Sequence, residues 1–350
     1  MAELDALKIF IPAALAFVIG IAATPLLTHF LYKYRLWKSA GKRALDGKEA
    51  TMFNSLRAGR PEAPLFGGAI VWGSVLLTAG LLSALAAFSG APAFKTLAFI
   101  SRTETWLPLA ALAVGAFVGA VDDLFEIRRQ KGLRLRTRLL IVAAVSLLCA
   151  LWFYEKLGVS TISMPFVAHP VGLGALFIPF FVGVALFIYA GGIIDGIDGL
   201  AGGVFMSIFA AYAGIAVFEQ QPNLAAFCAA TVGGLLAFLW FNIPPARFYL
   251  SETGTMGLTL ALTVVAFLSD TISGGRGIAA LPVITLLLIV TVLSNIVQAL
   301  SKKFLGRKVL RIAPLHHHFE ALGWPPYKVT MRYWIVGIVA AIIGMTVAIL

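Results

Sequence analysis

Long apolar runs follow one another along most of the chain and are separated by short polar segments. A membrane-spanning helix needs roughly 20 mostly apolar residues, and ten runs approach or exceed that length. Transmembrane β-strands would instead show short alternating patterns, which this sequence lacks. The pattern therefore predicts ten spans, near residues 7–32, 65–90, 105–121, 138–155, 172–192, 200–218, 224–241, 255–270, 278–300 and 332–350.

Basic residues are concentrated in alternate connections between these runs. Of the 27 lysines and arginines, 22 lie in one set of alternate connections and 5 in the other. An excess of lysine and arginine marks the cytoplasmic side of a membrane protein. We therefore expect five loops in the cytoplasm and both termini outside.

Composition supports this picture and removes several alternatives. Hydrophobic residues make up 60% of the chain and charged residues only 12%, about half the usual charged share of a soluble domain. The net charge of +11 follows from the basic loops, so it requires no nucleic-acid partner, and it favours contact with anionic membrane lipids. The sequence predicts an all-α integral membrane protein with one polytopic domain over residues 1–350.

Acidic residues are few, and several lie at membrane boundaries on the basic side. A carboxylate at membrane depth is costly unless it is paired, bound to a metal or facing water. Several carboxylates at one face of a helical bundle therefore predict a shared polar cleft on the cytoplasmic face. The candidates are Asp122, Asp123, Asp195, Asp198, Glu252 and Glu320.

Asp122 and Asp123 are adjacent at the end of the third run. They could be an ordinary charged helix end whose acids pair with nearby arginines. Adjacent acids repel each other, however, and favour an external cation. Mg²⁺ commonly takes one or two carboxylates together with phosphate oxygens, so a magnesium site is the second interpretation.

Asp195 and Asp198 lie within the glycine-rich segment GGIIDGIDGLAGG. On a helix, their spacing would place both carboxylates on one face. Close helix packing through small residues explains the glycines, but it does not explain two acids among them. A ligand site is the interpretation that accounts for both.

Two further segments carry candidate chemistry. Asn242 could offer an amide and Tyr249 a flat ring to a base, although an ordinary interfacial loop with a belt tyrosine is the simpler alternative. His316, His317 and His318 are consecutive in the last basic loop. A row of imidazoles can donate hydrogen bonds to phosphates or bind a transition metal.

Together these segments resemble one known family. RIAPLHHHFEALGWPPYKVTMRYWIVGIV at 311–339 is similar to the carboxy-terminal block of the phospho-N-acetylmuramoyl-pentapeptide transferases. These enzymes are a branch of the polyprenyl-phosphate N-acetylhexosamine-1-phosphate transferases. The aspartate pair at 122–123, DGIDGLAGG at 195–203 and FNIPPARFYLSETG at 241–254 follow in the order of that family. The resemblance covers essentially the whole chain.

The resemblance implies a phosphoryl transfer at the surface of a bacterial cytoplasmic (inner) membrane. Phospho-MurNAc-pentapeptide would pass from UDP-MurNAc-pentapeptide to undecaprenyl phosphate, with Mg²⁺, to give lipid I and UMP in peptidoglycan synthesis. The implied catalytic residues are Asp122, Asp123, His316, His317 and His318. Asp195, Asp198, Asn242 and Tyr249 would bind the nucleotide, and Glu252 with Asp123 would hold the metal. Membrane lipids are expected partners, and a homodimer is left open.

Four departures from the family pattern stand near these positions. Glu252 replaces an aspartate in SETGT, and Gly192 replaces an asparagine. Residues 59–68 match the usual basic segment only loosely. Glu126 replaces a lysine, as in sister enzymes that use UDP-N-acetylglucosamine. Glu126 favours a sister transferase, against which the histidine block argues, and the four departures together leave a degenerate inactive relative as an alternative. A transporter that uses intramembrane acids is the non-enzyme alternative.

Overall fold

The computed structural model describes residues 2–37, 55, 63–101, 104–164, 167, 169–271 and 276–350. These residues are almost entirely helical, and their only sheet is a two-stranded antiparallel hairpin of β1 (Thr161–Ile162) and β2 (Val171–Gly172). The helices are α1 (Ala2–Lys33), α3 (Gly68–Phe88), α4 (Pro92–Leu97), α5 (Trp106–Arg129), α6 (Leu135–Lys156), α7 (Phe177–Gly191), α8 (Leu200–Phe218), α9 (Pro222–Asn242), α10 (Ser251–Thr271), α11 (Gly277–Ile284), α12 (Leu286–Leu305), α13 (Leu315–Ala321) and α14 (Pro326–Ile349).

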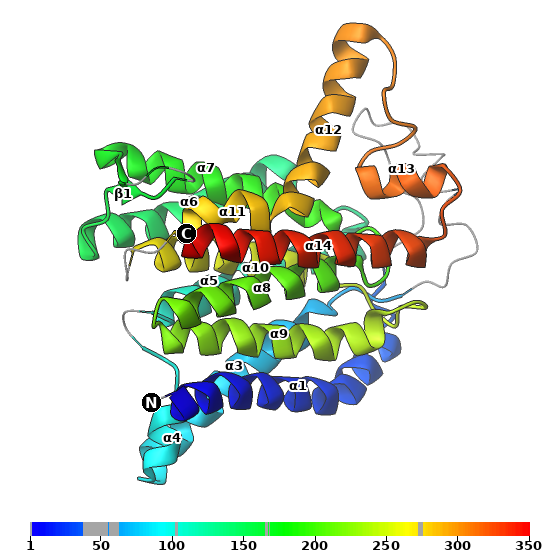
Figure 1. The fold of residues 1–350 in the computed structure, drawn as a ribbon. Helices are drawn as coiled ribbons and strands as arrows, with labels where there is room; N and C mark the ends of the chain where they lie inside the picture. The colour runs from blue at the N-terminus through cyan, green and yellow to red at the C-terminus, as the bar shows by residue number, and fades with distance from the viewer. Residues whose placement is uncertain are drawn as a thin grey trace.

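Ten of the described helices are long and apolar enough to cross a membrane, which confirms the predicted all-α multi-pass fold. Both ends of the chain lie at one end of the bundle, and α13 lies at the opposite end (Figure 1). A chain with an even number of spans has both of its ends on the same side of the membrane.

Two predicted boundaries were wrong in ways that matter for the site. The third span does not end near residue 121, because α5 continues to Arg129 and carries Asp122 and Asp123 as buried residues. Likewise, α10 begins at Ser251, so Glu252 lies in its first turn and not before the helix. Hydropathy marks where apolar residues stop, whereas a helix continues until its backbone pattern is broken.

The predicted single span over 278–300 was also wrong. It is divided into α11, which ends at Ile284, and α12, which begins at Leu286. Pro282 lies inside α11 and has no N–H for a helical hydrogen bond, so it weakens the helix just before the break. After the break α12 leaves the direction of the other spans and projects beyond the bundle (Figure 1).

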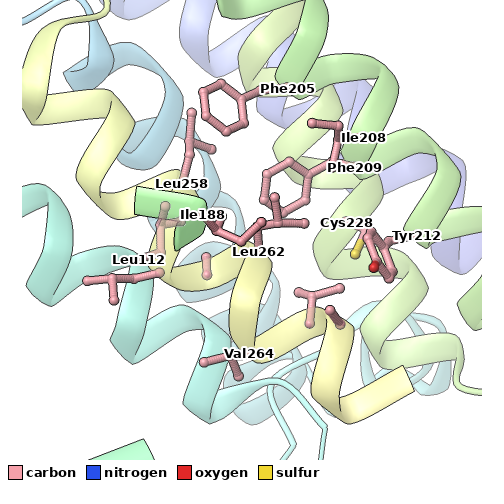
Figure 2. Close-up of a cluster of buried hydrophobic side chains, with 14 of the residues drawn as sticks. Leu112, Ile188, Phe205, Ile208, Phe209, Tyr212, Cys228, Leu258, Leu262 and Val264 are labelled. Carbon is pink, nitrogen blue, oxygen red and sulfur yellow. The ribbon is translucent and has the colours of Figure 1, made fainter. Parts of the chain in front are cut away.

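The most enclosed of the described spans is α10. In its most apolar stretch of 18 residues 89% of the residues are buried, against 17% in α1. Its Leu258 and Leu262 pack in a cluster with Phe205 and Phe209 of α8 and with Cys228 of α9 (Figure 2). Both cysteines are free and buried, as expected of small core residues. The central helix therefore has protein on all sides, and its N-terminal turn is held in place by its neighbours.

Glycines allow α5 and α10 to lie backbone to backbone. A Cβ atom on Gly115 would lie 2.8 Å from the Cα of Gly257, and a Cβ on Gly119 would lie 2.0 Å from the carbonyl oxygen of Glu252. Small residues at such positions let two membrane helices approach closely. This contact sets the position of Asp123 on α5 against the first turn of α10.

We expect Gly115→Ala to lower the stability of the protein, because the added methyl group must separate two backbones that have no room to adapt. Overpacking of this kind costs about 1–3 kcal/mol. The thermal unfolding temperature in detergent measures the effect. Gly80→Ala is the matched control, since nothing lies within 4 Å of its added Cβ, and alanine favours a helix over glycine by about 1 kcal/mol. Equal unfolding temperatures for the two variants would contradict the close packing.

Candidate active site

A cavity of about 330 Å³ brings together residues from the ends of several helices. Leu65 lines the cavity and is held by the segment that follows α1, because its N–H donates to the carbonyl of Leu36 at 2.9 Å. The cavity is called here the acidic cavity, because five of its side chains are carboxylates: four belong to the predicted site and the fifth, Glu126, flanks it. Its lining consists of Leu65, Asp122, Asp123, Glu126, Gly132, Leu133, Arg138, Gly192, Ile193, Asp195, Tyr249, Ser251, Glu252 and Thr255.

Asp123 binds the first turn of α10. Its Oδ2 accepts hydrogen bonds from Ser251 Oγ at 2.6 Å, from the backbone N–H of Thr253 at 2.9 Å and from the Thr253 hydroxyl. The first N–H groups of a helix have no partner inside the helix, and the helix dipole favours an anion there. Asp123 therefore caps α10 from another helix with one oxygen, and these three bonds leave Oδ1 for other uses.

Asp122 is bound by the segment that follows its own helix. Its Oδ1 accepts a hydrogen bond from the backbone N–H of Leu133, and its Oδ2 lies 3.5 Å from Arg138 Nη1. A Cβ atom on Gly132 would lie 2.9 Å from Oδ1, so this approach requires glycine. The simpler interpretation of the aspartate pair, pairing with a nearby arginine, thus applies to Asp122, whereas Asp123 binds hydroxyl and backbone donors.

Arg138 forms the centre of a second group. Arg138 Nη1 donates to Glu252 Oε1, and the Tyr189 hydroxyl donates to Glu252 Oε2 at 3.3 Å. The sequence had placed Glu252 among the metal ligands and had counted Arg138 only as a cytoplasmic charge. An arginine in the first turn of an apolar span was the signal that could have identified it. In this arrangement both oxygens of Glu252 are already bound by protein donors.

The glycine-rich segment does not form the helix on which its two acids would share one face. Residues Gly192–Ile194 form one 3-10 turn, and Gly199, in the left-handed conformation with φ at 75°, immediately precedes α8. Asp195 lines the acidic cavity, where its Oδ2 accepts the N–H of Ser251 at 2.8 Å. Asp198 points elsewhere and accepts the N–H of Ala246 at 3.1 Å.

Asn242 connects two loops and lies outside the cavity lining. Its Oδ1 accepts from the N–H of Gly199 at 2.9 Å, and its Nδ2 donates to the carbonyl of Phe248 at 2.7 Å. Both polar atoms of this buried amide are therefore used by backbone. Tyr249, by contrast, lines the acidic cavity, and its backbone is fixed by Pro64 and Gly67. Of the loosely matching segment 59–68, residues 59–62 lie outside the described residues.

The three histidines divide into two groups on α13. His317 Nδ1 lies 2.7 Å from Glu320 Oε2, and both side chains are buried. A Cβ atom on Gly196 would lie 2.5 Å from His316 Nε2 and 2.8 Å from His317 Nε2, so both rings cover the loop between Asp195 and Asp198. His318 faces away and accepts the N–H of Arg311 at 3.1 Å. Glu320 was one of the six candidate carboxylates but had no role assigned to it; it pairs with His317 and does not line the acidic cavity.

Aromatic stacking fixes α13 against α14. The rings of Phe319 and Trp324 are stacked with centroids 4.7 Å apart, and the guanidinium of Arg332 lies 4.2 Å above Trp324. A cation over an indole face is attracted by the ring quadrupole. This arrangement positions His316 and His317 over the glycine-rich loop.

A divalent cation in the acidic cavity would have few protein ligands. Among the described residues there is no group of three or more histidine, cysteine or acidic side chains arranged to hold a metal ion. Mg²⁺ does not need such a group, because it is usually bound by one or two carboxylates with substrate phosphates and waters. Asp123 fits this requirement through Oδ1. Glu252 would fit only after giving up Arg138 or Tyr189.

Comparison with known proteins places the chain in a family. Residues 105–270 match the model of glycosyl transferase family 4. A phospho-N-acetylmuramoyl-pentapeptide-transferase of Chloroflexus aggregans is 31% identical, over 99% of this chain and 91% of the relative. One of Listeria monocytogenes serotype 4b is also 31% identical, over 96% of this chain and 97% of the relative. The chain therefore belongs to the phospho-N-acetylmuramoyl-pentapeptide-transferase family and is a membrane-embedded transferase.

Proposed function

We propose that the protein transfers phospho-MurNAc-pentapeptide from UDP-MurNAc-pentapeptide to undecaprenyl phosphate, forming lipid I and UMP for peptidoglycan synthesis. The observation that carries this proposal is the acidic cavity, where motifs separated by more than a hundred residues converge on the first turn of α10. The full-length similarity to transferases of that name supports the choice of substrates. A sister reaction with another UDP-sugar is not favoured by these relatives.

The proposed reaction requires a soluble and a lipid substrate, both anionic, to meet at one membrane surface. The 22 basic residues in one set of loops support a cytoplasmic position for this surface, in the inner membrane of a bacterium. Arg138 lines the cavity and supplies a local positive charge. Phosphoryl transfer depends mainly on positioning and on neutralisation of charge, which a cavity of this kind can provide.

We assign roles by position relative to the cavity. Asp122 and Asp123 would orient or deprotonate the lipid phosphate, since both line the cavity at the end of α5. Asp195 and Tyr249 would bind the nucleotide, with the tyrosine ring stacking on uracil. These four residues keep the roles that the resemblance implied.

The remaining predicted site residues would contact the diphosphate or position the four residues that line the cavity. His316 and His317 would contact the diphosphate, because their rings cover the loop that carries Asp195. Asp198 and Asn242 bind backbone atoms of neighbouring loops, so we propose that they position the nucleotide site. His318 would hold the chain at Arg311 and have no direct contact with substrate.

We propose Mg²⁺ as the cofactor and Asp123 as its principal protein ligand. When bound, such a cation neutralises charge on the phosphate oxygens. Asp123 lines the cavity and has its Oδ2 bound by Ser251 and Thr253, so Oδ1 is the oxygen that would bind the cation. Glu252 keeps Arg138 in the cavity in the described arrangement, and the sequence-based assignment of Glu252 as a second ligand remains a prediction.

The assay of the reaction tests the proposed function directly. The purified protein, given Mg²⁺ and undecaprenyl phosphate, is expected to release UMP from UDP-MurNAc-pentapeptide. Omitting the lipid acceptor is the control, since transfer requires it. Release of UMP only with UDP-N-acetylglucosamine would replace the substrate assignment by the sister reaction. Release with neither sugar would contradict the proposal.

Metal binding is tested by comparing Asp123→Asn with Glu252→Gln. Asp123→Asn should lower UMP release by about a hundredfold or more and raise the Mg²⁺ concentration that gives half-maximal activity, because a metal ligand is lost. If Glu252 only pairs with Arg138, Glu252→Gln changes the rate without changing that concentration. A Mg²⁺ requirement raised in the Glu252 variant would place Glu252 in the metal shell. Near-normal activity of Asp123→Asn would remove this residue from the mechanism.

The variants His317→Gln and His318→Gln test whether the two histidines have different roles. A hydrogen bond to a charged group contributes about 1.5–3 kcal/mol, so losing one from His317 to the diphosphate should lower kcat/KM by about 10–100-fold. His318→Gln should stay within about twofold, since His318 faces away from the glycine-rich loop and substitutions away from a site and from the core rarely exceed about 0.5 kcal/mol. Equal losses in the two variants would show that the division of the histidines is wrong.

A further inference from the structure

A second cavity lies between the end of α1 and the loop that connects α9 to α10. Its volume is about 490 Å³, and it is lined by Pro25, Thr28, His29, Tyr32 and Arg247. The α1 residues are spaced three, four and seven positions after Pro25, so they lie along one face of the helix. This cavity, called here the α1 pocket, shares no lining residue with the acidic cavity.

The α1 pocket lies where apolar surface gives way to basic chain. Leu26, Phe30 and Ile243 beside it are 64%, 45% and 51% exposed, as expected of side chains that face lipid tails. Immediately beyond Tyr32, the helix ends at Lys33. One side of the pocket therefore adjoins the hydrocarbon region, and the other adjoins the level of lipid headgroups.

The pocket carries the positive charge of Arg247, which has no acidic partner in the part of the chain that the structure describes. Arg247 makes no ion pair with the described residues, and its guanidinium lies 5.7 Å from the centre of the Phe241 ring. His29 also lines the pocket; its ring makes an edge contact with Phe30, and its ring nitrogens make no hydrogen bond with the described residues. None of the five lining residues is acidic.

Backbone bonds hold Arg247 in this position. The Tyr32 hydroxyl donates to the carbonyl of Arg247 at 3.1 Å, and the N–H of Arg247 donates to the carbonyl of Phe241 at 2.8 Å. Thr28 has its hydroxyl bonded within α1, to the carbonyl of Thr24 at 2.8 Å. The donors that remain for a ligand are therefore the guanidinium of Arg247 and the imidazole of His29.

We propose that the α1 pocket binds the phosphate group of an anionic phospholipid such as phosphatidylglycerol, with Arg247 as the residue that contacts the phosphate. A planar guanidinium matches the geometry of phosphate oxygens. Basic pockets beside membrane helices bind such headgroups. The exposed Leu26 and Phe30 would lie against the acyl chains. Binding does not depend on the proposed reaction, because it concerns a different cavity.

The α1 pocket and the acidic cavity are connected by the loop between α9 and α10. Arg247 and Tyr249 belong to the same short loop, with Arg247 at the α1 pocket and Tyr249 in the acidic cavity. Asp198 holds the preceding Ala246. A phosphate bound between α1 and Arg247 would restrain the loop that presents Tyr249.

Thermal unfolding of the full chain in zwitterionic detergent tests the proposal. Short-chain phosphatidylglycerol should raise the unfolding temperature in a saturable manner, since a ligand that binds the folded state stabilises it. In Arg247→Gln the concentration for half of this rise should increase about tenfold, the loss of about 1.4 kcal/mol of binding free energy. His29→Gln should give a smaller increase.

Lys303→Gln is the matched control, because Lys303 is an exposed cation on α12 away from the pocket; its response should equal that of the unchanged protein. Short-chain phosphatidylcholine should have little effect. Equal responses of Arg247→Gln and Lys303→Gln would overturn the proposal. An equal rise with inorganic phosphate would also overturn it, by showing that the pocket takes free phosphate and not a lipid. These outcomes require no turnover, so they are distinct from a failure of the UMP assay.

Discussion

Carboxylates at membrane depth must be neutralised, and the first turn of α10 is where this protein meets that requirement. Asp123 binds the backbone of Thr253 and the hydroxyl of Ser251, while Asp195 binds the N–H of Ser251. A helix N-terminus offers unpaired N–H groups and the positive end of a dipole. Two acids from distant parts of the chain thereby bind the donors of one helix N-terminus, and both line the acidic cavity.

This arrangement depends on close packing of the helix backbones around the first turn of α10. Gly115 and Gly119 let α5 approach the backbone of α10, and Gly68 approaches Gly254 so closely that a Cβ there would lie 2.2 Å from its nitrogen. If these helices were separated by even one methyl group, Asp123 could not reach the first turn of α10. The close packing of glycines therefore determines where the charged side chains lie in this fold.

Arg138 shows how a charged residue can serve both topology and the site. It belongs to the basic residues that predict the cytoplasmic side, yet its guanidinium contacts Glu252 and lies 3.5 Å from Asp122. Because Glu252 has a longer side chain than aspartate, it reaches both Arg138 and Tyr189. The departure of Glu252 from the family pattern is thus accommodated by contacts with its own neighbours.

The sequence by itself determined the multi-pass helical fold, the number of spans and the set of acidic segments, because hydropathy and the rarity of membrane acids are local properties. It could not determine that α5 continues past Asp123, that the ninth run breaks after Pro282, or that Asp195 and Asp198 point to different partners. Those outcomes depend on which donors lie nearby in space. Only the tertiary structure decided that His317 pairs with Glu320 and His318 with the backbone of Arg311, since adjacent residues on a helix point in different directions.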